Sequence, residues 1–334
     1  MNLEEIWQRL EDDTRGPSRS GRAQRRLSPS GRRDFFLGLD MPSMNRMLIL
    51  KVAAASLDEQ PETEDSHGLV VRIALGEPNV GEAEVALVLT DVERGDIFNL
   101  LIEDLVGATE EPTDEAEAVK RFLARLSDWQ QLLRQLGRQG LSREAQQGLW
   151  GELWALREVF APVTGLCKAV QVWRGPMGAD QDFQLPGLCA EIKTSTASTL
   201  DRLSISSERQ LDAPTDVVLL LIALSLDDRP SHGETLPEIV RGLRSEASSL
   251  GCMGALDARL ELSGYRAEHA TSFEEIGYAV RSLAPFRVEE GFPRIKSSDL
   301  RTGVSDVRYA VSAAASAPFV IDEQRPDELL KDLV

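Results

Sequence analysis

The stretch that decides the fold runs from Asp182 to Thr194 and reads DFQLPGLCAEIKT. Its Pro-Gly pair at 186–187 is typical of a tight turn, and the apolar residues on either side predict two short antiparallel strands. Side chains alternate along a strand, so Glu191 and Lys193 share one face of the second strand. The turn folds the first strand back and brings its leading acid beside them. Two carboxylates and an ammonium are therefore expected on one sheet face.

These residues have the chemistry of a metal-dependent phosphodiesterase. Asp182 and Glu191 would hold a divalent cation, whose charge stabilises a scissile phosphate and lowers the pKa of a bound water. Lys193 would orient or deprotonate that water and offset developing negative charge. The peptide carbonyl of Ile192 is a further ligand, because hard cations accept backbone oxygens. We predict Mg²⁺ as the cofactor, with Mn²⁺ as a substitute.

The acid-x-Lys element alone is weak evidence. The 334 residues contain 55 acids and six lysines, so about one such pair is expected by chance. Glu191 and Lys193 form the one pair that occurs. An exposed acid and lysine at a strand edge is the plain alternative. The context favours a site, because the pair lies in an apolar strand after a tight turn from an acid.

A helix is predicted upstream from Ser142 to Phe160, with Ser142 as its candidate N-cap. Glu152 lies beside the apolar stripe of this helix. Such an acid is commonly a solvated flank. Directed toward Asp182 and Glu191, it would instead bind the metal or orient a water. The stripe consists of Leu149, Leu153, Leu156 and Phe160.

Four segments resemble the PD-(D/E)XK-motif proteins of the DUF4420 group: GLWGELWAL at 148–156, VQVWRGP at 170–176, Asp182-Phe183, and EIKT at 191–194. The resemblance is strongest over Leu141 to Asp212. It implies a restriction-endonuclease-like fold and a Mg²⁺-dependent DNA endonuclease that acts in a restriction or phage-defence system. Other defence proteins are the implied partners.

By this likeness, Asp182, Glu191 and Lys193 match the family's catalytic trio, and Glu152 matches a helix acid that many relatives place before it. The residue before Asp182 is Gln181 where the motif has proline. This leaves both Asp180 and Asp182 open as the metal ligand. We prefer Asp182, because the strand continues directly from it.

The polar stretch Ser204 to Gln210 follows the second strand. It would contact phosphates, support Lys193, or form an ordinary polar loop and helix cap. No phosphate loop of the GxxxxGK[ST] form occurs, so we do not expect the chain to use ATP.

Two domains are expected, an α+β domain at 1–138 and a nuclease-like α/β domain at 139–334 with a C-terminal elaboration. Seven arginines and no acid lie at 15–33, which indicates a flexible arm or a phosphate-binding arm. The first domain is predicted to contain an antiparallel sheet. Its expected elements are helices at Leu3–Leu10, Gly95–Leu105 and Asp114–Leu136 and strands at Asp34–Leu39, Met47–Ala53, Leu69–Leu75 and Glu84–Leu89.

The second domain is predicted to be a mixed sheet flanked by helices. Val217 to Leu226 is its most apolar run and its expected central strand. The other expected strands are Ala169–Trp173, Asp182–Leu185, Leu188–Thr194 and Leu256–Leu262, and the further helices are Leu236–Leu250 and Ser272–Leu283.

Composition narrows the function classes. The three cysteines are too few and too scattered for a disulfide framework or a zinc site, and the three histidines are equally isolated. A net charge of −18 argues against binding DNA, and favours the alternative of a non-catalytic scaffold or DNA-recognition subunit. We expect a soluble cytoplasmic protein with no membrane span. Cutting both DNA strands needs two active sites, so a homodimer is expected.

Overall fold

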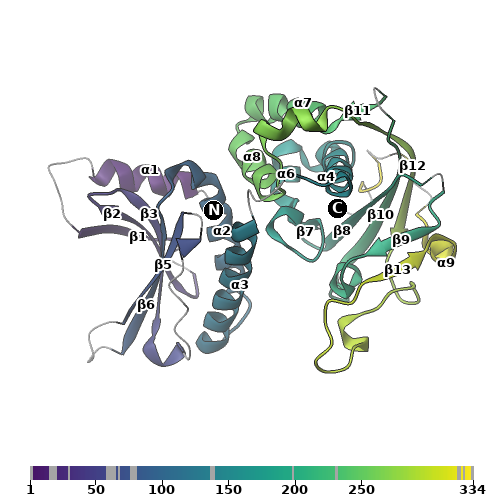
Figure 1. Cartoon of the computed structure of the whole chain (residues 1–334). Helices are drawn as coiled ribbons and strands as arrows, with labels where there is room; N and C mark the ends of the chain where they lie inside the picture. The colour runs from purple at the N-terminus through teal and green to yellow at the C-terminus, as the bar shows by residue number, and fades with distance from the viewer. Residues whose placement is uncertain are drawn as a thin grey trace. The chain divides into compact units, whose positions relative to one another are not determined.

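A computed structural model of the chain contains two compact units, Met1–Leu136 and Gly137–Val334 (Figure 1). Among the described residues, no helix is both long and apolar enough to cross a membrane. The residues that the structure describes are 3–14, 21–28, 31–57, 65–66, 68–75, 81–135, 140–197, 199–229, 232–321, 325 and 328–331.

The N-terminal unit is an antiparallel sheet packed against helices, as the sequence predicted. Its strand order is β1-β2-β3-β6-β5-β4. Phe35 of the sheet contacts Phe122 of α3, and Trp7 of α1 contacts Phe98 of α2. The elements are α1 (Leu3–Thr14), β1 (Gly21–Arg26), β2 (Asp34–Met41), β3 (Asn45–Ala53), β4 (Asp65–Ser66), β5 (Leu69–Leu75), β6 (Glu82–Leu89), α2 (Gly95–Ala108) and α3 (Glu115–Gln135).

The arginine-rich stretch corrects one expectation. Residues 21–26 form β1, which pairs with β2 along its whole length, so this part is an edge strand rather than a flexible arm. Three of its arginines have acidic partners: Arg22 pairs with Glu84, Arg25 with Asp13, and Arg26 with Asp34. The acidic partners, which the local sequence lacks, lie on other elements of the same unit: α1, β2 and β6. Residues 15–20 and 29–30 lie outside the described residues.

The C-terminal unit is built on a mixed sheet, as predicted, in the order β11-β12-β10-β8-β7. β8 and β10 are parallel, and the other pairs are antiparallel. β10 is buried over nearly all of its length, which explains its continuous apolar sequence. The strands are β7 (Phe183–Leu185), β8 (Leu188–Ser195), β10 (Val218–Asp227), β11 (Glu234–Thr235) and β12 (Gly277–Arg287).

Helix α4 (Arg143–Ala155) packs directly on β8. It begins after Ser142, whose hydroxyl accepts a hydrogen bond from the backbone N–H of Ala145 at 3.2 Å, as the N-cap prediction required. A β-carbon at Gly151 would lie 2.2 Å from Cγ2 of Thr194, so the absence of a side chain allows this close packing. The other helices are a π-helical turn (Leu156–Phe160), α5 (Ala161–Thr164), α6 (Leu166–Val172), α7 (Leu236–Leu250), α8 (Met253–Leu262) and α9 (Ala313–Ser316).

Three predicted elements are wrong in type. The expected strand at Ala169–Trp173 lies mostly in α6, and the expected strand at Leu256–Leu262 lies in α8. The expected helix at Ser272–Leu283 is instead the end of a 3₁₀ segment followed by β12. In each of these short segments, the spacing of the apolar residues alone does not separate helix from strand.

Two smaller features complete the unit. β9 (Arg202–Ile205) pairs with β13 (Tyr309–Ser312), and a 3₁₀ turn, η5 (Glu208–Leu211), follows β9. Cys167 of α6 and Cys252, directly before α8, form a disulfide across 85 positions of sequence. Their distant spacing gave no sign of this pairing, which arises because α6 and α8 lie side by side.

Candidate active site

The structure brings together the acids and the lysine of the 182–194 stretch. Oδ2 of Asp182, directly before β7, accepts a hydrogen bond from the backbone N–H of Ile192 at 2.8 Å. On β8, Nζ of Lys193 lies 2.7 Å from Oε1 of Glu191. The hairpin therefore places two carboxylates and one ammonium around a single strand.

The short length of β7 creates this arrangement. β7 pairs with β8 only over Leu188–Ala190, so the edge of β8 beyond Ala190 is open to the Asp182 side chain. The N–H and C=O of one strand residue point to the same side. Because the N–H of Ile192 faces Asp182, its carbonyl faces the same open edge.

Glu152 joins the cluster from α4. Its Oε2 accepts a hydrogen bond from Nε1 of Trp173 at 2.7 Å. A β-carbon at Gly175 would lie 2.8 Å from Oδ1 of Asp182 and 3.3 Å from Oε2 of Glu152. Both carboxylates therefore converge on the backbone of Gly175, where a larger residue would displace them.

The three carboxyl groups have raised pKa values. Burial raises the pKa of Asp182 to about 6, although the N–H of Ile192 opposes the shift. Burial and then the charge of Asp182 raise the pKa of Glu191 to about 8. The pKa of Glu152 is raised well above its usual range by the same two causes. Burial and mutual repulsion therefore disfavour the charged forms of these carboxyls, and a cation bound among them would favour those forms.

Lys193 has a second hydrogen-bonding partner, Gln210, in the polar stretch that follows β9. Its Nζ donates a hydrogen bond to Oε1 of Gln210 at 3.1 Å, and the same oxygen accepts one from the backbone N–H of Ser206 at 2.8 Å. Of the roles considered for Ser204–Gln210, these contacts fit the one in which the stretch supports Lys193. Asp180, the other candidate ligand, is half-exposed and pairs with Arg209 at 3.5 Å.

Several residues around the cluster were not predicted. Trp173 and Gly175 lie within the VQVWRGP stretch, whose resemblance to the family was the available signal. Arg259 of α8 is 1% exposed and donates hydrogen bonds to the carbonyls of Trp173 at 3.0 Å and Gln171 at 3.1 Å. No local pattern marks this arginine, because its role depends on the packing of α8 against α6.

The donor set fits a hard divalent cation. Oε2 of Glu191 is buried without a hydrogen-bond partner, and carboxylate oxygens are the ligands that Mg²⁺ prefers. In the described part of the chain, no three His, Cys, Asp or Glu side chains are already arranged to surround a metal ion. The candidate ligands are therefore the carboxylates of Asp182 and Glu191 and the carbonyl of Ile192, with Glu152 beside them.

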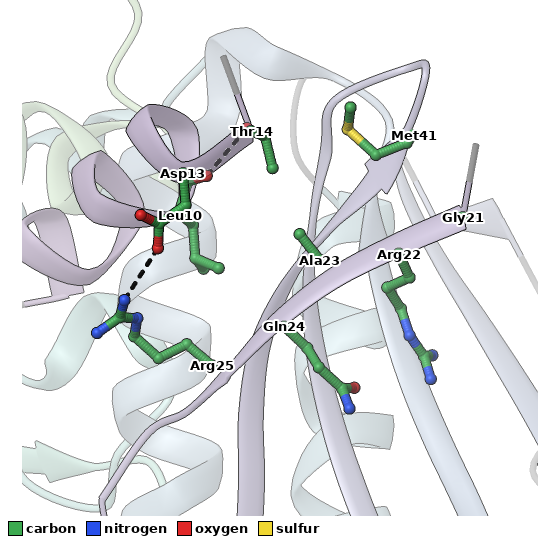
Figure 2. Close-up of a pocket in the computed structure, with 9 residues that line it drawn as sticks. All are labelled: Leu10, Asp13, Thr14, Gly21, Arg22, Ala23, Gln24, Arg25 and Met41. Carbon is green, nitrogen blue, oxygen red and sulfur yellow. Dashed lines mark hydrogen bonds and ion pairs between the residues drawn. The ribbon is translucent and has the colours of Figure 1, made fainter. Parts of the chain in front are cut away.

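A pocket in the N-terminal unit is separate from these residues. Figure 2 shows it between α1 and β1, where Arg25 pairs with Asp13. Its lining also contains Leu10, Thr14 and Met41. It includes none of the predicted site residues, so the acidic cluster on β8 remains the candidate site.

One of three comparisons with known proteins, the one against family models, agrees with the sequence resemblance. A family model described as "Putative PD-(D/E)XK family member, (DUF4420)" matches residues 3–314. No curated protein and no solved structure matches the chain. The match extends across both units, from α1 to α9. The chain belongs to the DUF4420 family of PD-(D/E)XK proteins, as the four resembling segments predicted.

Proposed function

We propose that the protein is a Mg²⁺-dependent DNA endonuclease that acts in the cytoplasm as part of a restriction or phage-defence system. The observation that carries the proposal is the meeting of Asp182, Glu191 and Lys193 at the open edge of β8. Membership of a nuclease-type family supports the same reaction class. DNA is the proposed substrate, and other defence proteins and a second copy of the chain are the proposed partners.

In the proposed mechanism, Asp182, Glu191 and the carbonyl of Ile192 would hold a Mg²⁺ ion, and Glu152 would assist them as a ligand or by orienting a water. The bound ion would supply Lewis acidity toward the scissile phosphate and toward a water. Lys193 orients the attacking water and offsets negative charge as it develops on the phosphate. Gln210 fixes the direction of the Lys193 ammonium. Trp173 fixes one oxygen of Glu152.

Cleavage of supercoiled plasmid and phage DNA tests this function directly. Wild-type protein is expected to nick or linearise DNA with Mg²⁺ or Mn²⁺ and not with EDTA. Asp182→Ala and Lys193→Ala should lose this activity. Lys168→Ala is the matched control, because Lys168 is an exposed lysine on α6. Metal-dependent cleavage that persists in an Asp182→Ala, Lys193→Ala double variant would contradict the proposal.

A second candidate function is a non-catalytic scaffold or DNA-recognition subunit that keeps the nuclease fold. It is favoured by the net charge of −18 and by the direct ion pair of Lys193 with Glu191, which occupies the lysine. Isothermal titration with Mg²⁺ and Mn²⁺ separates the two functions. Absence of binding at millimolar metal supports the scaffold, whereas binding that Glu191→Gln weakens supports the nuclease.

A further inference from the structure

Gln181, the residue directly before Asp182, is a buried polar side chain with a defined set of partners. Only 5% of it is exposed. Its Nε2 donates to the carbonyl of Arg209 at 2.8 Å and to that of Asp212 at 3.2 Å. Its Oε1 accepts a hydrogen bond from Nε2 of Gln184 at 3.3 Å. A buried amide in a polar site keeps its place only where such partners satisfy it.

The carbonyls that Gln181 holds belong to the η5 turn and the residue after it. This turn carries Gln210, whose Oε1 accepts the hydrogen bond from Lys193. Gln181 and Asp182, which are consecutive in sequence, therefore contact the two parts of the candidate site, the η5 turn and β8. Asp182 binds the N–H of Ile192 on β8, and Gln181 binds the turn that supports the lysine.

We infer that Gln181 is a positioning residue, which sets η5 against the Asp182 segment and thereby directs Gln210 toward Lys193. Proline, which the family motif places before the acid, has no side-chain donor for these carbonyls. The departure from the motif thus supplies a link between the acid and the lysine. The link itself is independent of catalysis, and only its consequence for cleavage rests on the proposed nuclease function.

Other hydrogen bonds tie η5 to the later part of the chain. Arg294 donates to the carbonyl of Leu211 at 2.6 Å, and the backbone N–H of Val307 donates to Glu208 at 2.8 Å. η5 is therefore expected to stay folded when Gln181 is changed. Variants of Gln181 consequently report on where η5 lies relative to Asp182.

The experiment follows the side-chain nitrogen of Lys193 by NMR in the full chain labelled with ¹⁵N-lysine, without metal or DNA. The chain has six lysines, and loss of one signal in Lys193→Arg assigns the relevant one. Gln181→Leu removes both donors, and Gln210→Leu removes the direct partner of the lysine. The matched control is Gln146→Leu, since Gln146 also donates to a backbone carbonyl, that of Leu141 at 3.0 Å.

Wild type should show a Lys193 signal displaced from those of the exposed lysines. Gln181→Leu is expected to move it toward them, in the same direction as Gln210→Leu, and Gln146→Leu should leave it in place. Gln181→Asn keeps the amide but shortens it by one methylene, and it serves if the leucine variant does not fold. A Lys193 signal that stays at its wild-type position in the folded Gln181 variants overturns the inference.

The measurement separates this inference from the proposed function, because it needs neither cleavage nor metal. If the protein does cut DNA, Gln181→Leu should lower kcat by up to about 10²-fold, the usual cost of a misplaced catalytic group. The KM for DNA should change little, because Gln181 is buried away from solvent. A variant that raises KM with kcat unchanged would show that Gln181 affects DNA binding rather than Lys193.

Discussion

The site is unusual at the scale of single residues because its carboxylates are buried before any cation is added. Glu191 is 1% exposed and has one lysine as its ionic partner, while Asp182 and Glu152 lie close by. Burial and mutual repulsion both disfavour the charged forms. A divalent cation bound among these carboxyls would favour their charged forms and so offset the cost of burial.

Glu191→Gln is expected to change how stability depends on pH in the metal-free protein. The folded pKa of Glu191 is about 8, above the value of an exposed glutamate. Stability is then fully present below the unfolded pKa and is lost as pH rises through the folded pKa. The loss for one such group is at most about 1.4 kcal/mol per pH unit.

Urea unfolding at pH 5, 6, 7 and 8 in EDTA measures this effect. Wild type should lose stability toward pH 8, and Glu191→Gln should lose less. The comparison requires that Lys193 keeps its position in the Glu191→Gln variant, and the NMR signal of Lys193 checks this. Equal pH profiles for the two proteins would show that Glu191 does not titrate in this range.

At the scale of elements, the contact of α4 with β8 determines where Glu152 lies. The contact depends on Gly151, because a β-carbon there would overlap Thr194 of β8. Gly148 lies one turn earlier on the same helix, and a β-carbon there would meet no atom within 4 Å. The two glycines form a matched pair that separates packing from helix propensity.

Gly151→Ala is expected to destabilise the protein by about 1–3 kcal/mol through overpacking. Gly148→Ala should instead be neutral or stabilising by up to about 1 kcal/mol, because alanine is the better helix former. Chemical denaturation of the two variants gives the comparison. If Gly151→Ala were as stable as Gly148→Ala, α4 would not need to pack closely on β8.

The elements also show what could be predicted from sequence. The hairpin from Asp182 to Lys193 was predictable, because its turn and its alternation are local. Leu256–Leu262 misled because its residues alternate between apolar and polar, although Arg259 is buried with its guanidinium on backbone carbonyls. The segment around Gly277 has helical spacing, but a β-carbon there would lie 2.2 Å from the carbonyl of His232, and the chain runs extended.

The supporting residues of the site, which come from separate segments, could not be predicted from local sequence patterns. Trp173, Gln181 and Gln210 act through contacts with residues 17 to 28 positions away, which no local period encodes. The acid and lysine set could be predicted because its members lie on one hairpin. Its supporting contacts depend on tertiary packing and required the structure.

At the scale of the whole molecule, the net charge of −18 limits how DNA could be bound. The arginines of β1, which looked like a candidate phosphate-binding arm, are paired with acids of their own unit. β1 therefore offers few unpaired arginines to DNA phosphates. Under the proposed function, affinity for DNA would depend on the metal and on contacts near the site more than on the overall field.

DNA affinity is accordingly expected to depend only modestly on salt. A protein that contacts 6–10 phosphates loses about 10³–10⁵ in affinity between 50 and 200 mM salt, and we expect a smaller loss here. Fluorescence anisotropy with a labelled duplex and the Lys193→Ala variant measures it without cleavage. Arg22→Ala should leave the salt slope unchanged, because Arg22 is already paired with Glu84. A reduced slope in that variant would restore β1 as a phosphate-binding surface.

The disulfide between Cys167 and Cys252 makes a covalent ring of the chain between α6 and α8. β7, β8, η5 and β10 all lie inside the ring, and so do Asp182, Glu191 and Lys193. A protease that cuts the backbone once within the ring would leave both pieces attached to each other. Such a nicked molecule would migrate as one species on a gel and separate into two only after a reductant is added, so its acids and lysine would remain in a single molecule.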